Sequence, residues 1–165
     1  FNLLGPLSNP AGASHQLLGV YEPRWLRPMA EALQALGTAR AWVVHGVDGI
    51  DEISIAGATR IAELADGAIR EFEITPGEAG LDTHPLSALE GASVEDNARA
   101  VLELLDGQPG PFRDVVTLNA GAGLFITGHA GDLSEGTAKA AQAIDNGAAG
   151  RTLRLLVETS HGRGI

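Results

Sequence analysis

The chain has 165 residues, of which 44% are hydrophobic, and this composition supports one sizeable core in a single domain over residues 1–165. Its 21 acidic and 11 basic residues give a net charge of -10 without a basic cluster, so we expect no nucleic-acid partner. The absence of cysteine from the sequence excludes disulfides, thiolate metal sites and cysteine nucleophiles.

The ends and the hydropathy of the chain lead to two further expectations. No run reaches the roughly 18 consecutive apolar residues of a membrane span, so we expect a cytoplasmic protein with no membrane partner. The chain begins at Phe1 and its single methionine is Met29, so we expect it to be a fragment of a longer protein.

The first forty residues predict a loop, a strand and a helix. Residues 1–10 are apolar but broken by Pro6 and Pro10, which predicts a structured loop. Residues 16–21 read as a short buried strand. A helical pattern then starts at Pro23 and stops at Gly37, with apolar residues at three- and four-residue spacing: Trp25, Leu26, Met29, Leu33, Leu36.

A second apolar run at residues 39–44 completes a strand, helix, strand order, which is typical of a right-handed βαβ unit with parallel strands. The turn at residues 45–50 follows it directly. We therefore expect this turn at the carboxyl edge of the sheet, where α/β proteins usually bind ligands.

The next segments predict further strands at residues 51–55, 59–64 and 68–74. The last two are joined across Asp66-Gly67, a dipeptide suited to a tight hairpin. The predicted fold class is α/β, with a central, mostly parallel sheet, some antiparallel strands, and covering helices.

The C-terminal half predicts helices. Ser93 is a good N-cap for a helix that Gly107 ends. Two alanine-rich helices at residues 112–127 and 134–144, the second capped by Ser134, are expected to cover the sheet. Residues 149–158 read as helical or extended. Within the first of the alanine-rich helices, we interpret Gly121-Ala-Gly123 as a site of close helix packing rather than a nucleotide-binding loop.

The segment from His45 to Glu52 carries the most informative chemistry. Adjacent carboxylates on a strand point to opposite faces, so Asp51 and Glu52 serve one site only where the backbone turns, as Gly46 and Gly49 permit. Mg²⁺ typically takes one or two protein carboxylates, with phosphate and water as the remaining ligands. The alternative is that these acids are ordinary solvated loop residues. His45 also has two interpretations: its side chain contacts a phosphate, or it forms a hydrogen bond with the backbone.

The pattern His-Gly-x-Asp-Gly-x-Asp-Glu after a buried strand is similar to the metal-binding motif of anthranilate phosphoribosyltransferases. Four other blocks, at residues 1–10, 16–21, 113–120 and 143–148, resemble the same family in the same order. Together the blocks cover essentially the whole chain.

The resemblance implies an enzyme of tryptophan biosynthesis that transfers the phosphoribosyl group of 5-phosphoribosyl diphosphate to the amine of anthranilate. It implies the large C-terminal domain of the nucleoside phosphorylase/phosphoribosyltransferase type. By the same resemblance Asp51 and Glu52 match the Mg²⁺ ligands, and Gly5 and Pro6 match a loop at the anthranilate entrance, against the alternative of a turn that only redirects the chain.

The resemblance also implies parts that lie upstream of Phe1. These are a glycine-rich diphosphate-binding loop and a helical N-terminal domain that forms a homodimer, so we expect the 165 residues alone to be inactive. Two other functions stay open: a pyrimidine nucleoside phosphorylase, whose metal independence leaves Asp51 and Glu52 unexplained, and a non-catalytic nucleic-acid-binding relative, which would carry a basic surface.

Overall fold

The computed structural model describes residues 3–9, 11–91 and 93–162. Within these ranges four strands form one sheet in the order β1-β2-β3-β4. The strands are β1 (His15–Gly19), β2 (Arg40–Gly46), β3 (Thr59–Ala65) and β4 (Ala68–Ile74). The α-helices are α1 (Leu4–Leu7), α2 (Leu26–Ala35), α3 (Val94–Leu105), α4 (Pro111–Ile126), α5 (Leu133–Asp145) and α6 (Ala148–Ser160), and single 3-10 turns occupy Pro23–Trp25, Pro76–Ala79 and Leu86–Leu89.

The sheet topology confirms the α/β class and the βαβ unit. β1 and β2 are parallel and α2 connects them. The β3–β4 hairpin turns at Asp66 and Gly67, whose φ angles of 50° and 73° are the positive values that this dipeptide predicts.

The expectation of a mostly parallel sheet is wrong, since the described strands make one parallel and two antiparallel pairs. The physical reason is the length and content of the connections. Only the link from β1 to β2 contains a helix that carries the chain back to the same edge, whereas β2 returns through an irregular loop at residues 47–58 and β3 through a two-residue turn.

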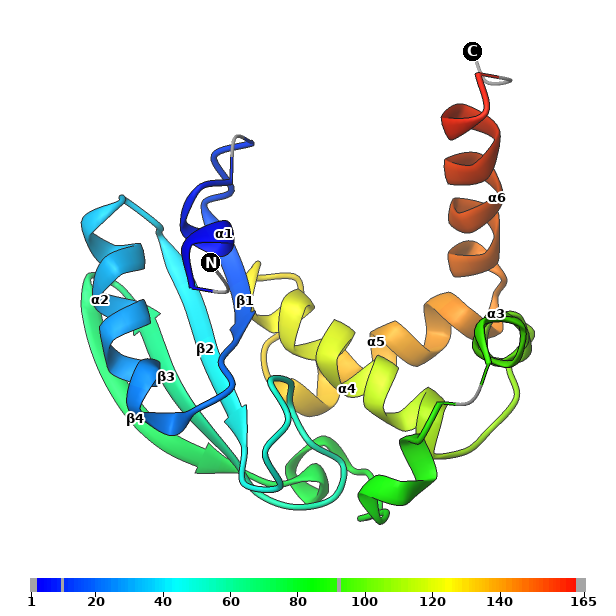
Figure 1. The fold of residues 1–165 in the computed structure, drawn as a ribbon, viewed down its shortest axis with the longest axis horizontal. Coiled ribbons are helices and arrows are strands. Elements are labelled where there is room, and N and C mark those ends of the chain that lie inside the picture. The colour runs from blue at the N-terminus through cyan, green and yellow to red at the C-terminus, as the bar shows by residue number, and fades with distance from the viewer. Residues whose placement is uncertain (1–2, 10, 92, 163–165) are drawn as a thin grey trace.

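Strand β2 is buried on both of its faces, whereas the edge strand β4 is mostly exposed. On one face, α2 packs against Val43 and Ala62. On the other, α4 packs against Trp42 and Val44. Figure 1 shows α2 and α4 on opposite sides of the sheet. Alternate residues of β2 therefore belong to two separate cores, as the period of two requires.

The opening segment is not entirely a loop. Residues 4–7 form the single turn α1, and Pro6 is accommodated because a helix has no internal partner for the N–H groups of its first turn. The helix ends at Leu7, and of the second proline, Pro10, the structure describes nothing. The predicted strand at residues 51–55 is also wrong, because this segment is irregular and its backbone bonds to side chains instead of to a neighbouring strand.

The helices of the C-terminal half pack on one another more than on the sheet. α5 lies along α4, and the two helices touch at glycine. A Cβ at Gly121 would stand 2.4 Å from the backbone nitrogen of Thr137, and one at Gly136 would stand 2.3 Å from the Gly121 carbonyl oxygen. Close packing is thus confirmed for Gly121, but it is wrong for Gly123, which has open space beside it.

Two other expectations for this half need correction. α5 packs mainly against α4 and so does not itself form the layer that covers the sheet. Its N-cap is Asp132, which accepts a hydrogen bond from the Glu135 N–H at 2.8 Å, and not Ser134, because the helix already begins at Leu133.

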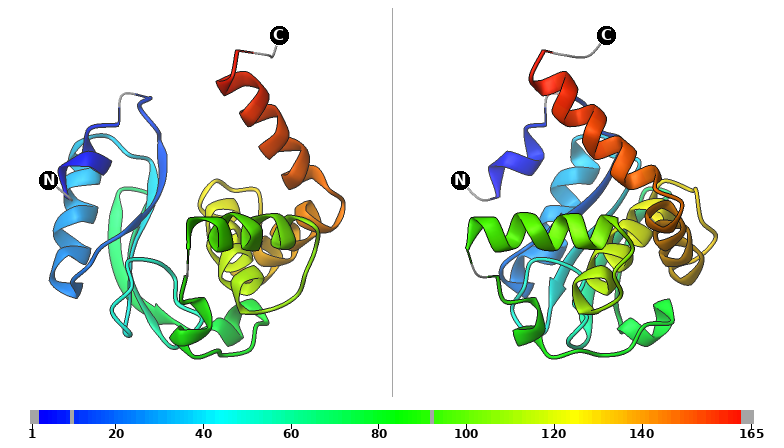
Figure 2. Two further views of the ribbon diagram at one scale, coloured as in Figure 1. Left: turned by 45° about the vertical axis from the view of Figure 1, so that its right-hand side comes forward. Right: turned by 90° about the vertical axis from the view of Figure 1, so that its right-hand side faces the viewer.

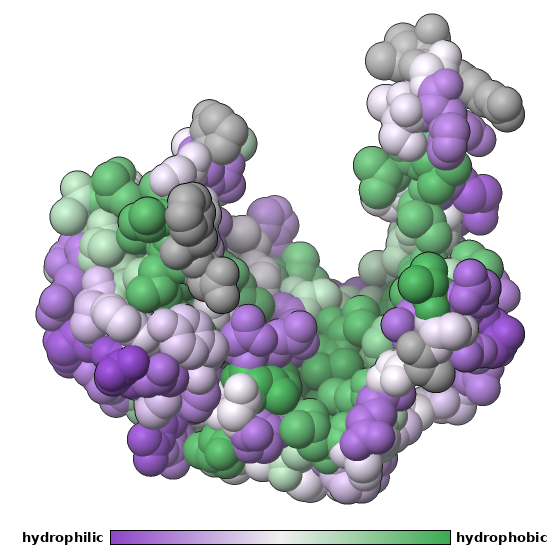
Figure 3. Space-filling model, viewed as in Figure 1, coloured by the Kyte–Doolittle hydropathy of each residue, from purple (hydrophilic) through white to green (hydrophobic). Residues whose placement is uncertain are grey.

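The last helix stands clear of the sheet. α6 resolves the choice between helical and extended structure, and the turned views show it projecting away from the body (Figure 2). Leu155 and Leu156 on α6 are more than half exposed, as is Leu102 on α3. Figure 3 shows apolar surface on α6 and over α4 and α5, in the hollow beneath it. None of the helices in the described ranges is long and apolar enough to span a bilayer.

Candidate functional site

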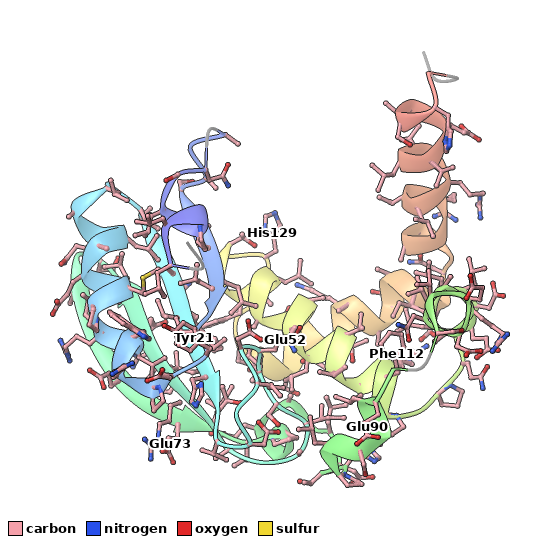
Figure 4. The ribbon with its side chains drawn as sticks, in the orientation of Figure 1. Tyr21, Glu52, Glu73, Glu90, Phe112 and His129 are labelled. Atoms are coloured by element: carbon pink, nitrogen blue, oxygen red, sulfur yellow. The ribbon has the colours of Figure 1, made fainter. Side chains whose placement is uncertain are left out.

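The acidic loop at residues 47–58 leaves the sheet at the carboxyl ends of the two parallel strands, as the sequence predicts. It runs between the sheet and α4, with Glu52 near the centre of the molecule (Figure 4). Edges of this kind are where α/β proteins bind ligands, because the strands end there and their loops are free to vary.

The loop begins with a tight turn that glycine makes possible. The Gly46 N–H donates to the Ile50 carbonyl at 2.9 Å, the Gly49 N–H donates to the Gly46 carbonyl at 2.9 Å, and Gly49 has a φ of 97°. Asp48 is held inside this turn, since its carboxylate accepts the Ser54 hydroxyl at 2.5 Å. Asp48 is therefore engaged by the fold in this arrangement.

Asp51 and Glu52 differ from Asp48. Both side chains are exposed, and neither carboxylate has a hydrogen-bond or ion-pair partner among the residues that the structure describes. The backbone turns directly before them, as two adjacent carboxylates require if they are to serve one site.

Gly19, at the end of β1, allows the segment to lie directly against the sheet. A Cβ at Gly19 would stand 1.6 Å from the Asp51 carbonyl oxygen, a distance that no side chain tolerates. The backbone of Asp51 therefore rests on the carboxyl end of β1, which brings the acidic segment to the edge of the parallel pair.

The residues directly after the carboxylates are anchored in the core. Ile53 and Ile55 are at most 1% exposed and pack with Trp42 under α4. The Asn119 side chain, on α4, accepts a hydrogen bond from the Ile53 N–H and donates one to the Ile53 carbonyl, each at 3.0 Å. Sequence reasoning assigned Asn119 no role. The available signal was a polar residue one helical turn after Val115, on the face that α4 buries.

His45 is buried and its Nδ1 lies 2.8 Å from the Val20 carbonyl oxygen, so the backbone satisfies it and that reading is confirmed. Gly5 and Pro6 lie on α1, and the structure does not bring them together with the acidic pair. Pro6 lines a separate hollow of about 220 Å³ with residues that precede β1 and follow α2, at the amino end of the parallel strands.

A larger hollow of about 620 Å³ lies at this amino end, beside Arg40, Glu63 and Arg70. Arg40 and Arg70 both pair with Glu63. Glu63 is 1% exposed and accepts hydrogen bonds from Trp42 Nε1 at 2.9 Å and from Arg70. Burial on its own raises the pKa of Glu63, but the hydrogen bonds from Trp42 and Arg70 and the charges of Arg70 and Arg40 outweigh it, so the pKa is lowered. We interpret this cluster as part of the fold.

The donors present fit one kind of metal site. The described residues contain no group of three or more acidic or histidine side chains placed to hold an ion, so an all-protein cage is not formed there. Two exposed carboxylates on a loop fit Mg²⁺, which keeps water and takes substrate phosphates as its other ligands.

Comparison with known proteins places this geometry in a family. Residues 1–150 match the glycosyl transferase family, a/b domain. The chain belongs to this family. Its curated relatives include anthranilate phosphoribosyltransferases from Hyphomonas neptunium, 61% identical over 97% of the chain and 47% of the relative, and from Mesorhizobium japonicum, 55% identical over 98% and 48%. The chain thus spans about half the length of the curated relatives it matches.

Solved structures of family members are similar in fold. A crystal structure of anthranilate phosphoribosyltransferase from Thermus thermophilus has a TM-score of 0.83 and 44% identity, over 92% of this chain and 45% of that chain. The Saccharomyces cerevisiae enzyme in complex with PRPP and Mg has a TM-score of 0.81 and 29% identity, over 92% and 44%. The resemblance read from the sequence motifs is therefore confirmed.

Proposed function

We propose that this chain is the C-terminal α/β part of an anthranilate phosphoribosyltransferase. The enzyme transfers the phosphoribosyl group of 5-phosphoribosyl diphosphate (PRPP) to anthranilate, giving N-(5-phosphoribosyl)anthranilate and diphosphate in tryptophan biosynthesis. The observation that carries the proposal is the Asp51-Glu52 pair, exposed and unpartnered among the described residues at the carboxyl edge of the parallel strands. The 61% identity to the Hyphomonas neptunium enzyme supports it.

Asp51 and Glu52 are the residues that would hold Mg²⁺. When bound, the ion would neutralise charge on the departing diphosphate. The chain itself contributes the position of the two carboxylates, through the turn at Gly46, the contact at Gly19 and the buried anchor at Ile53. The Saccharomyces cerevisiae relative was solved with PRPP and Mg, which supports this ligand pair.

Gly5 and Pro6 are proposed to line the path by which anthranilate enters. Gly5 is exposed, and an added side-chain carbon there would meet nothing within 4 Å, so a planar aromatic acid has space to approach it. A Saccharomyces cerevisiae relative in complex with 4-fluoroanthranilate supports a substrate of this chemistry.

We infer that residues 1–165 form one domain of a longer, cytoplasmic, homodimeric enzyme. The diphosphate-binding loop and the helical dimerisation domain would lie outside this chain, and the chain alone would be inactive. An apolar hollow of about 640 Å³ bounded by α3, α4 and α5, together with the exposed leucines of α6, supports further protein packing on this side.

Neither alternative function gains support. A nucleic-acid-binding relative would be expected to carry a basic surface, whereas the net charge is -10. A metal-independent phosphorylase would leave an exposed acidic pair at the ligand-binding edge without a purpose.

The test is formation of phosphoribosylanthranilate from PRPP, anthranilate and Mg²⁺ by the longer enzyme, by its Asp51→Ala/Glu52→Ala variant and by the 165-residue chain. We expect product only from the unsubstituted longer enzyme. Full activity in the double variant would rule out the metal role, and no activity in the longer enzyme, with its fold intact, would rule out the transferase.

A further inference from the structure

We propose that Asn119 is a positioning residue for the acidic pair, acting through the backbone of Ile53. The inference rests on the proposed function, because it concerns how the two Mg²⁺ ligands of that site are held. Asn119 itself does not touch the metal or the substrate in this account.

The contacts of Asn119 are complete and specific. Its Oδ1 accepts the Ile53 N–H at 3.0 Å, and its Nδ2 donates to the Ile53 carbonyl at 3.0 Å. The same Nδ2 also donates to the Val115 carbonyl, one turn earlier on α4, at 3.0 Å. One side chain therefore engages both backbone groups of Ile53, as a neighbouring strand would, while a third bond fixes it to its own helix.

The segment it holds has little other support. Residues 51–54 make no backbone-to-backbone hydrogen bond with any residue that the structure describes. Before them, the turn closes at the Ile50 carbonyl, and at their last residue the Ser54 N–H donates to the Thr59 hydroxyl at 2.9 Å. Asn119 is thus the polar attachment nearest to Glu52 on its C-terminal side.

The attachment point is rigid. α4 is a 16-residue helix that packs on the sheet through Leu118 and Ala122, both fully buried. Ile53 is 1% exposed and packs in the same core. The segment lies between α4 on one side and Gly19 on the other, and these two contacts fix the position of its backbone. This position determines where the carboxylates of Asp51 and Glu52 reach solvent.

Residues that orient metal ligands without touching the metal change metal affinity when they are replaced. Asn119→Ala leaves the N–H and carbonyl of Ile53 without their side-chain partner, so the segment is freed to move. We expect the Mg²⁺ concentration for half-maximal activity of the longer enzyme to rise by about tenfold or more. We also expect the Ile53 amide to exchange its hydrogen much faster.

The matched control is Thr117→Val on the same helix. Thr117 is 2% exposed, and its hydroxyl donates only to the Asp114 carbonyl of its own helix, so the substitution removes a buried polar group without touching the acidic segment. We expect an unchanged Mg²⁺ requirement and unchanged exchange at Ile53, even where thermal stability falls as much as in Asn119→Ala.

A second variant tests the proposal if Asn119→Ala does not fold. Asn119→Asp keeps an acceptor for the Ile53 N–H but, when ionised, has no donor for the Ile53 carbonyl. We expect the Mg²⁺ requirement of this variant to rise above that of the unsubstituted enzyme, so it tests the proposal where the alanine variant does not fold.

Two outcomes separate this proposal from the proposed function. If Asp51→Ala/Glu52→Ala abolishes activity or raises the Mg²⁺ requirement, but folded Asn119 variants leave this requirement at the unsubstituted value, the positioning role is overturned and the metal site stands. If the double variant itself leaves the Mg²⁺ requirement unchanged, the metal site is overturned, and the positioning proposal fails with it.

Discussion

The two ends of strand β2 use carboxylates in opposite ways. At the end that begins with Arg40, the Glu63 side chain is buried and bound by Trp42 and by arginine. At the end that finishes at Gly46, Asp51 and Glu52 are exposed, with no partner among the described residues. The carboxylate that protein groups already satisfy belongs to the fold, and the pair left to solvent is available to a ligand.

The sheet explains this difference. Antiparallel register places Trp42 directly opposite Glu63 on one side and Arg70 opposite it on the other, so the ladder itself supplies the partners. The acidic loop has no ladder. Its backbone is held by side chains such as Asn119, while Asp51 and Glu52 have no partner among the described residues.

Substitution of Glu63 should have the largest effect on stability. Glu63→Ala leaves the buried Trp42 indole N–H unsatisfied and removes the carboxylate partner of the partly buried Arg40 and the exposed Arg70, so we expect a loss of about 2–4 kcal/mol in the free energy of unfolding. Urea denaturation would measure it. The control is Glu73→Ala on β4, whose pair with Arg60 is exposed on both sides and should contribute about 1 kcal/mol or less. Equal losses in the two variants would contradict the assignment of Glu63 to the fold.

Gly19→Ala should have the next largest effect on stability and should also displace the segment that carries Asp51 and Glu52. The added carbon overlaps the Asp51 carbonyl, so the segment must shift. We expect a loss of about 1–3 kcal/mol in the free energy of unfolding and a higher Mg²⁺ concentration for half-maximal activity of the longer enzyme. Gly123→Ala, in a helix with open space beside it, should instead stabilise the protein by about 0.5–1 kcal/mol. Thermal unfolding of both variants would measure these changes, and a Gly19→Ala variant as stable as the unsubstituted chain would contradict the close contact at Gly19.

Protonation of Glu63 at acidic pH should lower the free energy of unfolding by a smaller amount. Because the pKa of Glu63 is lowered from its ordinary value of 4.5 in the folded state, its contribution is complete above that value and disappears as the pH falls through the lowered pKa. Glu63→Gln should flatten the decline in unfolding free energy over this acidic range, measured at a series of pH values. An unaltered pH profile would mean that other carboxylates dominate.

Asp51→Asn/Glu52→Gln should have the smallest effect on stability. Neither carboxylate has a partner to lose among the described residues, so we expect the free energy of unfolding to stay within about 0.5 kcal/mol of the unsubstituted chain. Denaturation in the absence of Mg²⁺ measures this effect on stability without any contribution from metal binding. A large loss would show that the pair belongs to the fold after all.

The sequence predicted what local pattern and resemblance determine. The hairpin at Asp66-Gly67 and the turn after β2 follow from residue types at fixed spacing, and both were found. The role of Asn119 was not predicted, because its contact with Ile53 joins positions 66 residues apart. The sequence pattern predicted a helix for α3 and a helical or extended segment for α6. It did not predict that apolar residues of both are exposed, since a helical period does not say whether another part of the protein covers the face.

The most direct test of the account is isothermal titration of PRPP, in the presence of Mg²⁺, into the longer enzyme and into its Asp51→Asn/Glu52→Gln variant, with folding of both checked by thermal unfolding. The account predicts equal stability and binding at least about tenfold weaker in the variant. Equal affinity in two equally folded proteins would contradict it, because the exposed pair would then be a solvated loop feature with no part in holding the metal.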